Sequence, residues 1–102
     1  MTYVHCVFFT CKAGTPANAI AAQIADAQEL LGKIPTVRVI CSGGRDIEAN
    51  RPVSVTDFDI GLVVIYDNKA DYQVYADHPL HMEYLKRHKE NWEQLRVFDY
   101  IC

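Results

Sequence analysis

Four segments of the chain carry the side chains typical of β-strands. Residues 4–11 read Val-His-Cys-Val-Phe-Phe-Thr-Cys, a run of β-branched, aromatic and small residues that predicts a first strand. Residues 36–42, 58–66 and 95–101 have a similar character and predict three more strands. The segments 4–11 and 58–66 are largely apolar on both faces, whereas an antiparallel strand with one solvated face alternates apolar and polar residues.

The segment between the first two strands has helical spacing. We expect Thr15 as its N-cap, Pro16 as its first helical residue, and an end at Gly32 or Lys33. Its apolar positions fall on one side of a helix and predict a single buried stripe, formed by Ile20, Ile24, Ala27 and Leu31.

A second helical region lies between the third and fourth strands. The pattern predicts a helix cap at Asp67-Asn68 and a short helix that ends at about Ala76. Pro79 is expected to interrupt it, and a further helix follows over about residues 81–92. The polar segment 44–56 is expected to be a long loop. The order is therefore β-α-β-β-α-β, which predicts an α+β ferredoxin-like fold with an antiparallel sheet, as a single domain over residues 1–102.

One face of this sheet needs a cover that the chain does not supply. Two helical regions cover only one face of a four-stranded sheet, yet Val7 and Phe8, and likewise residues 63–65, place apolar side chains on both faces. A second copy packed sheet against sheet would bury the free face and form a dimeric α+β barrel. A different protein on the same face is the alternative.

Charge and composition narrow the range of partners. The formal net charge is −3, which gives nucleic acid no attraction to the chain, so we expect no nucleic-acid partner. The longest apolar run, residues 60–66, is too short to span a bilayer, and the first residues lack the features of a signal peptide. We therefore expect no membrane partner and a cytoplasmic location. The four cysteines include no C-x-x-C pair, so disulfides are not expected.

Residues 75–81 and the first strand hold the side chains that can carry chemistry. His81 and His78 can exchange protons near neutral pH, and Tyr75 can donate a hydrogen bond to an oxyanion. His5 shares a face with apolar residues of the first strand and would lie at one end of an apolar pocket. The structural alternatives stay open: His78 precedes a proline and is suited to capping a helix, while His5 and Tyr75 are also plausible core residues.

Neither a metal nor a cofactor is expected. A zinc site would require His78, His81 and a third ligand such as His5 or Asp77, and H-P-x-H is not a usual zinc-binding pair. The chain contains no P-loop, no G-x-G-x-x-G and no G-x-S-x-G motif.

Four motifs spread over nearly the whole chain resemble the stress-responsive A/B barrel domain (Dabb) family, within the dimeric α+β barrel superfamily. They are His5-x-Val7-x-Phe9-x-x-Lys12, Ile34-Pro35-x-Val37, Tyr75-x-x-His78-Pro79-x-His81 and Val97-Phe98-Asp99-Tyr100. The resemblance implies a homodimer with a barrel between its subunits. It implies an activity only loosely, because many members have no assigned reaction.

One plant branch of the family, to which this chain is similar in residues 75–81, is that of olivetolic acid cyclase, a cofactor-free polyketide cyclase. By this resemblance His81 would be the base, Tyr75 the oxyanion donor, and His5 the third catalytic residue. The substrate pocket would be lined by Val7, Phe9, Ile24, His78 and Val97. The loop over residues 44–56 differs in composition from that of the plant branch.

Three functions follow from these expectations. The first is a cofactor-free cyclase or lyase acting on a small carbonyl compound in the apolar pocket. The second is a non-catalytic protein that binds a small hydrophobic ligand or acts in a stress response. The third is a cofactor-free monooxygenase or isomerase that uses the same pocket.

Overall fold

The structure, a computed structural model, describes all 102 residues. In chain order its elements are strand β1 (Tyr3–Cys11), helix α1 (Ala17–Asp26) continued by a π-helical turn (Ala27–Leu31), strands β2 (Val39–Gly44) and β3 (Ile60–Tyr66), helices α2 (Lys69–Ala76) and α3 (Pro79–His88), a 3-10 turn (Lys89–Asn91) and strand β4 (Trp92–Ile101).

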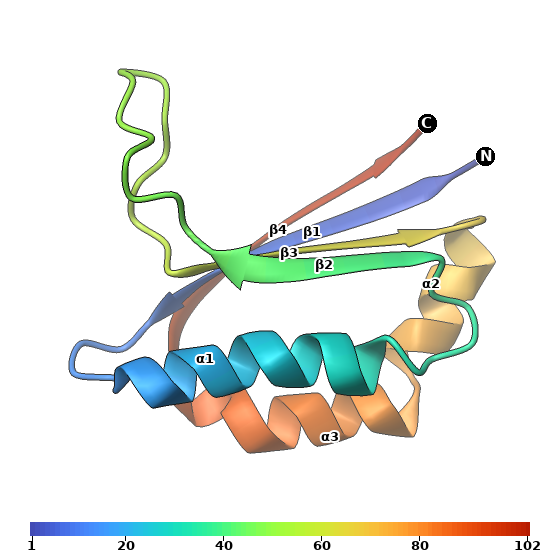
Figure 1. Cartoon of the computed structure of the whole chain (residues 1–102). Helices are drawn as coiled ribbons and strands as arrows, with labels where there is room; N and C mark the ends of the chain where they lie inside the picture. The colour runs from blue at the N-terminus through green and yellow to red at the C-terminus, as the bar shows by residue number, and fades with distance from the viewer.

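The four strands form one antiparallel sheet in the order β2-β3-β1-β4, with β1 at its centre. Helices α1 and α3 lie side by side against one face, and α2 lies at one end of that face (Figure 1). This arrangement confirms the ferredoxin-like α+β fold that the element order predicts. None of the helices has the length and apolarity needed to cross a membrane.

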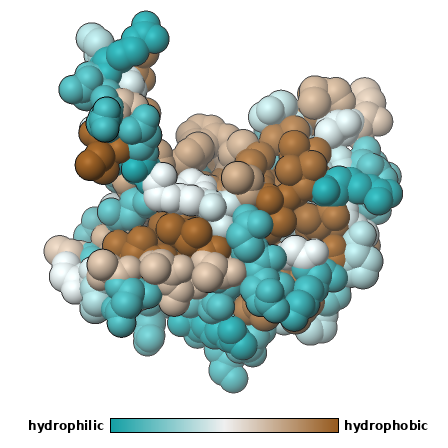
Figure 2. Space-filling model, viewed as in Figure 1, coloured by the Kyte–Doolittle hydropathy of each residue, from teal (hydrophilic) through white to brown (hydrophobic).

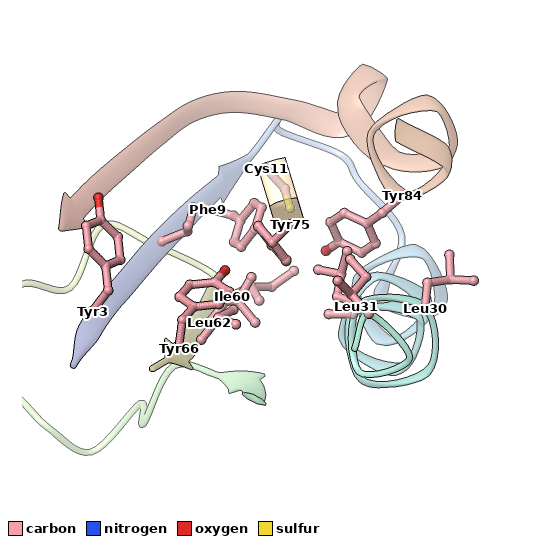
Figure 3. Packing of buried hydrophobic residues seen from close by; sticks show 14 residues of the cluster. Tyr3, Phe9, Cys11, Leu30, Leu31, Ile60, Leu62, Tyr66, Tyr75 and Tyr84 are labelled. Atoms are coloured by element: carbon pink, nitrogen blue, oxygen red, sulfur yellow. The ribbon is translucent and has the colours of Figure 1, made fainter. Parts of the chain in front are cut away.

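The core lies between the sheet and the helices. Alternate residues of the two central strands point into it, among them Val7 and Phe9 of β1 and Leu62 and Val64 of β3, each at most 5% exposed. Figure 3 shows residues of the sheet, such as Phe9, facing Leu31 of the π-helical turn and Tyr84 of α3 across this layer. The stripe predicted on the first helix packs here, and Leu31 is its most deeply buried member.

The second strand begins later than the sequence pattern predicts and extends beyond its predicted end. A turn in which Val37 N donates to Ile34 O at 3.0 Å precedes it, so pairing with β3 starts only at Arg38 and Val39. Gly43 and Gly44, which lie beyond the predicted end at residue 42, pair with Gly61 and Ile60.

Both helix starts that contain a proline differ by a residue or two from the predicted positions. Thr15 donates its hydroxyl to Lys12 O at 2.6 Å within a turn, so Pro16 takes the N-cap position instead. Pro79 begins α3 rather than interrupting a helix. The N–H groups of the first helical turn have no partner within the helix, so the N–H that proline lacks costs no hydrogen bond there. The last strand also begins at Trp92, which the pattern assigned to the preceding helix.

The sheet face opposite the helices carries apolar side chains at its surface. Phe98 and Tyr100 of β4 are 56% and 54% exposed, and Cys41 of β2 is also exposed. The 45–59 loop projects from the sheet on this side, away from the helices (Figure 1). Figure 2 shows hydrophobic surface over the strands beside the loop. We call the sheet face opposite the helices the free face.

Candidate functional site

A cavity of about 210 Å³ lies between the sheet and the helices, and 12 of its 14 lining residues are hydrophobic. An apolar cavity of roughly 150 Å³ is large enough for benzene, so this one has room for a single ring or a short branched chain. Six residues expected at the site lie on its wall: His5, Val7, Phe9, Tyr75, His81 and Val97.

His81 belongs to the first turn of α3 and has a defined tautomer. Its Nδ1 lies 3.0 Å from the backbone oxygen of Ala76, at the end of α2. Because a carbonyl oxygen only accepts hydrogen bonds, Nδ1 carries the proton, and in the neutral ring Nε2 holds a free lone pair. Burial is the largest influence on the pKa of His81 and lowers it, with a smaller lowering from the charge of His5. The ring is therefore neutral at neutral pH.

Tyr75 is the last buried side chain of α2 and contacts both histidines. It is 2% exposed, and its ring centroid lies 4.8 Å from that of His81 and 6.0 Å from that of His5. Burial raises the pKa of Tyr75 well above its ordinary value, so the hydroxyl stays protonated and can donate. Beside it, the Tyr66 hydroxyl is buried without a hydrogen-bond partner of normal geometry.

His5 is held by a residue that the sequence analysis did not place at the site. Asp99 of β4 lies directly opposite His5 in the β1–β4 ladder, and its Oδ1 is 2.5 Å from His5 Nδ1. An ionised carboxylate only accepts hydrogen bonds, so Nδ1 of His5 carries a proton and Nε2 is left for other partners. The pairing of a histidine and an aspartate on antiparallel neighbouring strands was the signal that could have found this contact.

Two residues expected in the pocket lie outside its lining. Ile24 of α1 packs against the core but is not among the residues that line the cavity. His78 caps α3, because its Nδ1 accepts a hydrogen bond from Leu80 N at 3.1 Å. That contact supports the structural interpretation of His78, which the sequence left open.

The side of the cavity near β4 is formed by Trp92, whose position depends on a buried amide. Trp92 Nε1 donates to Gln23 Oε1 at 2.7 Å, and Gln23 is fully buried on α1. The Gln23 backbone oxygen also accepts from the Tyr84 hydroxyl at 3.3 Å. Sequence reasoning missed these residues, because a polar side chain inside an apolar stripe gives no sign of its partners.

No group of three or more His, Cys, Asp and Glu side chains is placed to hold a metal ion. The cavity wall itself carries two histidines, three tyrosines and Trp92 as its residues with polar atoms in the side chain. Together they offer one neutral base, one carboxylate-bound imidazole and phenolic hydroxyl groups on the wall of a mostly apolar, partly open cavity.

Comparison with known proteins agrees with this geometry at the level of fold and family. The sequence profile of the stress responsive A/B barrel domain family matches residues 4–102. No functionally curated protein matches the chain.

Several solved structures are similar over almost their whole length. A dimeric protein of unknown function with a ferredoxin-like fold from Bacteroides fragilis is 25% identical, with a TM-score of 0.76 and coverage of 99% of this chain and 96% of that one. A Dabb family protein from Mesorhizobium loti is 24% identical, with a TM-score of 0.81 and the same coverage. A hydroxynitrile lyase from Passiflora edulis is 21% identical, with a TM-score of 0.81 and coverage of 99% and 93%.

Proposed function

The chain belongs to the stress responsive A/B barrel domain family, and we propose that it is a homodimeric, cofactor-free enzyme that forms or breaks a carbon–carbon bond in a small carbonyl compound. The observation that carries this proposal is the state of His81: its Nδ1 is bound to the Ala76 carbonyl, which leaves Nε2 as a free base on the wall of an apolar cavity.

The homodimer is supported by the free face. Phe98 and Tyr100 expose more than half of their surface there, which is an unfavourable arrangement for an isolated subunit. The relative from Bacteroides fragilis is itself dimeric.

The chemistry begins with proton transfer. His81 Nε2 removes a proton from the carbon next to a carbonyl group, and the charge that develops on the carbonyl oxygen accepts a hydrogen bond from the Tyr75 hydroxyl. In the bond-forming direction the resulting enolate attacks a second carbonyl group. In the bond-breaking direction the carbon–carbon bond breaks to give that carbonyl group and the enolate. The apolar walls leave the enolate few competing hydrogen-bond partners besides the Tyr75 hydroxyl.

The lyase direction has a parallel among proteins of this fold. The Passiflora edulis relative is a hydroxynitrile lyase, although at 21% identity the likeness extends to the fold alone. The size of the cavity favours a compound with one ring or fewer, which is smaller than the substrate of a polyketide cyclase.

The test is deuterium exchange into a simple ketone. Acetophenone in D₂O reports enolisation, because each proton removed from its methyl group is replaced by solvent deuterium, which NMR detects. We expect the wild-type protein to accelerate this exchange, and His81→Gln and Tyr75→Phe each to reduce the acceleration by about 10²-fold or more. Met82→Gln, on the same helix but exposed, is the matched control and keeps the wild-type rate.

A second candidate function is the binding of a small hydrophobic ligand without turnover, which the predominantly apolar wall favours. The only tryptophan of the chain, Trp92, lies on that wall, so its fluorescence reports occupancy of the cavity. If acetophenone changes Trp92 fluorescence saturably and the wild type gives no exchange above the buffer rate, the enzyme proposal is wrong and the binding function replaces it.

A further inference from the structure

The 45–59 loop, which joins β2 to β3 and which we call the arm, contains no helix or strand. Loops of this length without secondary structure are uncommon in compact domains, and they usually serve a function or are disordered. The arm stands out from the sheet on the side of the free face, away from the helices (Figure 1). A protein that packs on the free face therefore also lies beside the arm.

The arm leaves the sheet from a fixed base. Arg45 N donates to Asp59 O at 3.1 Å, which joins the two ends of the arm. Cys11 N donates to the Asp59 carboxylate at 2.7 Å. The Thr10 hydroxyl donates to the Asp57 backbone oxygen at 2.6 Å. These hydrogen bonds tie the base of the arm to β1, so the fold sets the direction in which the arm projects.

The outer part of the arm has local structure of its own. Ala49 N donates to Asp46 O at 3.1 Å, and Glu48 N donates to the Asp46 carboxylate at 3.0 Å. Ser54 N donates to Arg51 O at 2.8 Å in a second turn. Because these turns restrict the backbone before any partner binds, docking of the arm costs less conformational entropy than the ordering of a flexible segment.

Apolar side chains on the arm have no cover from their own chain. Val53 and Ile47 are 82% and 79% exposed, and they are two of the three most exposed large apolar side chains of the protein. Figure 2 shows hydrophobic surface on the arm among hydrophilic residues. Val55, which is also exposed, lies with Phe8 and Phe98 on the wall of a small cavity at the free face. Apolar surface therefore continues from the free face onto the arm.

We infer that the arm docks on a second copy of this chain and forms part of the dimer interface beside the free face. This inference rests on the homodimer of the proposed function and adds to it a contact outside the sheet. A second copy is the occupant that the structure favours, because the apolar surface of the arm is continuous with the free face and the relative from Bacteroides fragilis is dimeric.

The charges of the arm suit a contact between identical chains. Each copy carries a formal net charge of −3, so two copies repel each other at long range. In the outer part of the arm, Arg45 and Arg51 balance Asp46 and Glu48, so the arm adds no net charge to the contact. A nucleic acid or an anionic lipid surface would instead favour a basic arm.

Photo-crosslinking tests where the arm lies. The photoreactive amino acid p-benzoylphenylalanine is placed at position 47 or 53 of the full chain, and the protein is irradiated. We expect a covalent dimer on a denaturing gel, and mass spectrometry to locate the cross-link between the arm and the other copy. The same amino acid at position 82, exposed on α3 at the opposite side of the sheet, is the matched control and gives no covalent dimer.

Analytical ultracentrifugation measures what the contact contributes to the dimer. Ile47→Asn and Val53→Asn replace exposed apolar side chains by polar ones and leave the charge of the chain unchanged. We expect the double variant to raise the dissociation constant of the dimer by about tenfold or more, because the second copy then buries less apolar surface. Val74→Asn, at an exposed position of α2 on the helix side, is the matched control and leaves the dissociation constant unchanged.

The outcomes separate the arm contact from the homodimer itself. A wild-type dimer that gives no cross-link from the arm, or whose dissociation constant is unchanged in the double variant, overturns the arm contact and leaves the free face as the interface. Wild-type protein that stays monomeric at all concentrations removes the homodimer of the proposed function, and the arm contact with it. If the double variant does not fold, the single variants decide the matter.

Discussion

Trp92 Nε1 and Gln23 Oε1 are joined by a 2.7 Å hydrogen bond that ties the start of β4 to the middle of α1. The bond crosses the core beside the cavity and fixes an indole that forms part of the cavity wall. A buried amide that satisfies an indole N–H in this way contributes both to stability and to the shape of the site.

Replacing Gln23 by leucine is expected to destabilise the protein by about 1–3 kcal/mol, because the Trp92 N–H is then buried without an acceptor. Urea denaturation followed by tryptophan fluorescence measures the change. Gln28→Leu is the control: Gln28 is exposed and accepts from Ser42 N at 2.9 Å, so solvent can replace its partner. Equal losses in the two variants would show that the buried bond adds nothing to stability.

Two buried tyrosines are expected to respond in opposite ways to loss of the hydroxyl. Tyr66→Phe removes a hydroxyl that has no hydrogen-bond partner, so the free energy of unfolding stays unchanged or rises. Tyr84→Phe removes a donor to the Gln23 backbone oxygen and costs about 0.5–1.5 kcal/mol. Thermal and urea unfolding compare the pair. A clear loss of stability in Tyr66→Phe would mean that its hydroxyl has a partner in solution.

Helix α3 is expected to depend on its cap at His78. Since the His78 ring accepts from Leu80 N, His78→Ala should cost about 0.5–2 kcal/mol, and His78→Asn, which keeps a capping acceptor, should recover most of that loss. Both variants should retain the wild-type rate of acetophenone exchange. A specific loss of exchange without a change in stability would instead give His78 a role in the cavity.

The rate of exchange is expected to keep its plateau down to a lower pH than an ordinary histidine base would allow. Burial lowers the pKa of His81, so the neutral ring persists below about pH 6.5, the usual value for histidine. The same shift means that unfolded chains bind more protons than folded ones as the pH falls through this range, so stability decreases there. A pH–rate profile and an NMR titration of His81 check the direction, and a titration at or above the usual value contradicts it.

The free face is expected to be the dimer interface. Phe98→Asp places a charge among apolar side chains on that face and should convert the dimer to monomers in sedimentation experiments. Met82→Asp, on exposed helix α3 at the opposite side of the sheet, should leave the dimer intact. Wild-type protein that sediments as a monomer at all concentrations would rule out the homodimer.

The sequence by itself determined the fold, because each local signal agreed with the others. Runs of β-branched and aromatic residues, the helical spacing of apolar residues between them and the turn residues give four strands and the helices between them in an order that has a known packing solution. The errors lie at element ends, where a side chain such as that of Thr15 chooses between competing hydrogen bonds of similar strength.

Only the tertiary structure decided which of the candidate residues share the cavity. The sequence supplied His5, Tyr75 and His81, but it also offered Ile24 and His78, and it did not place Asp99 or Trp92 at the site. Whether a side chain reaches the cavity depends on the rotation of its helix and on the register of its strand, which are set by contacts between residues far apart in the chain. The pairing of His5 with Asp99 spans almost the full length of the sequence, so no local pattern encodes it.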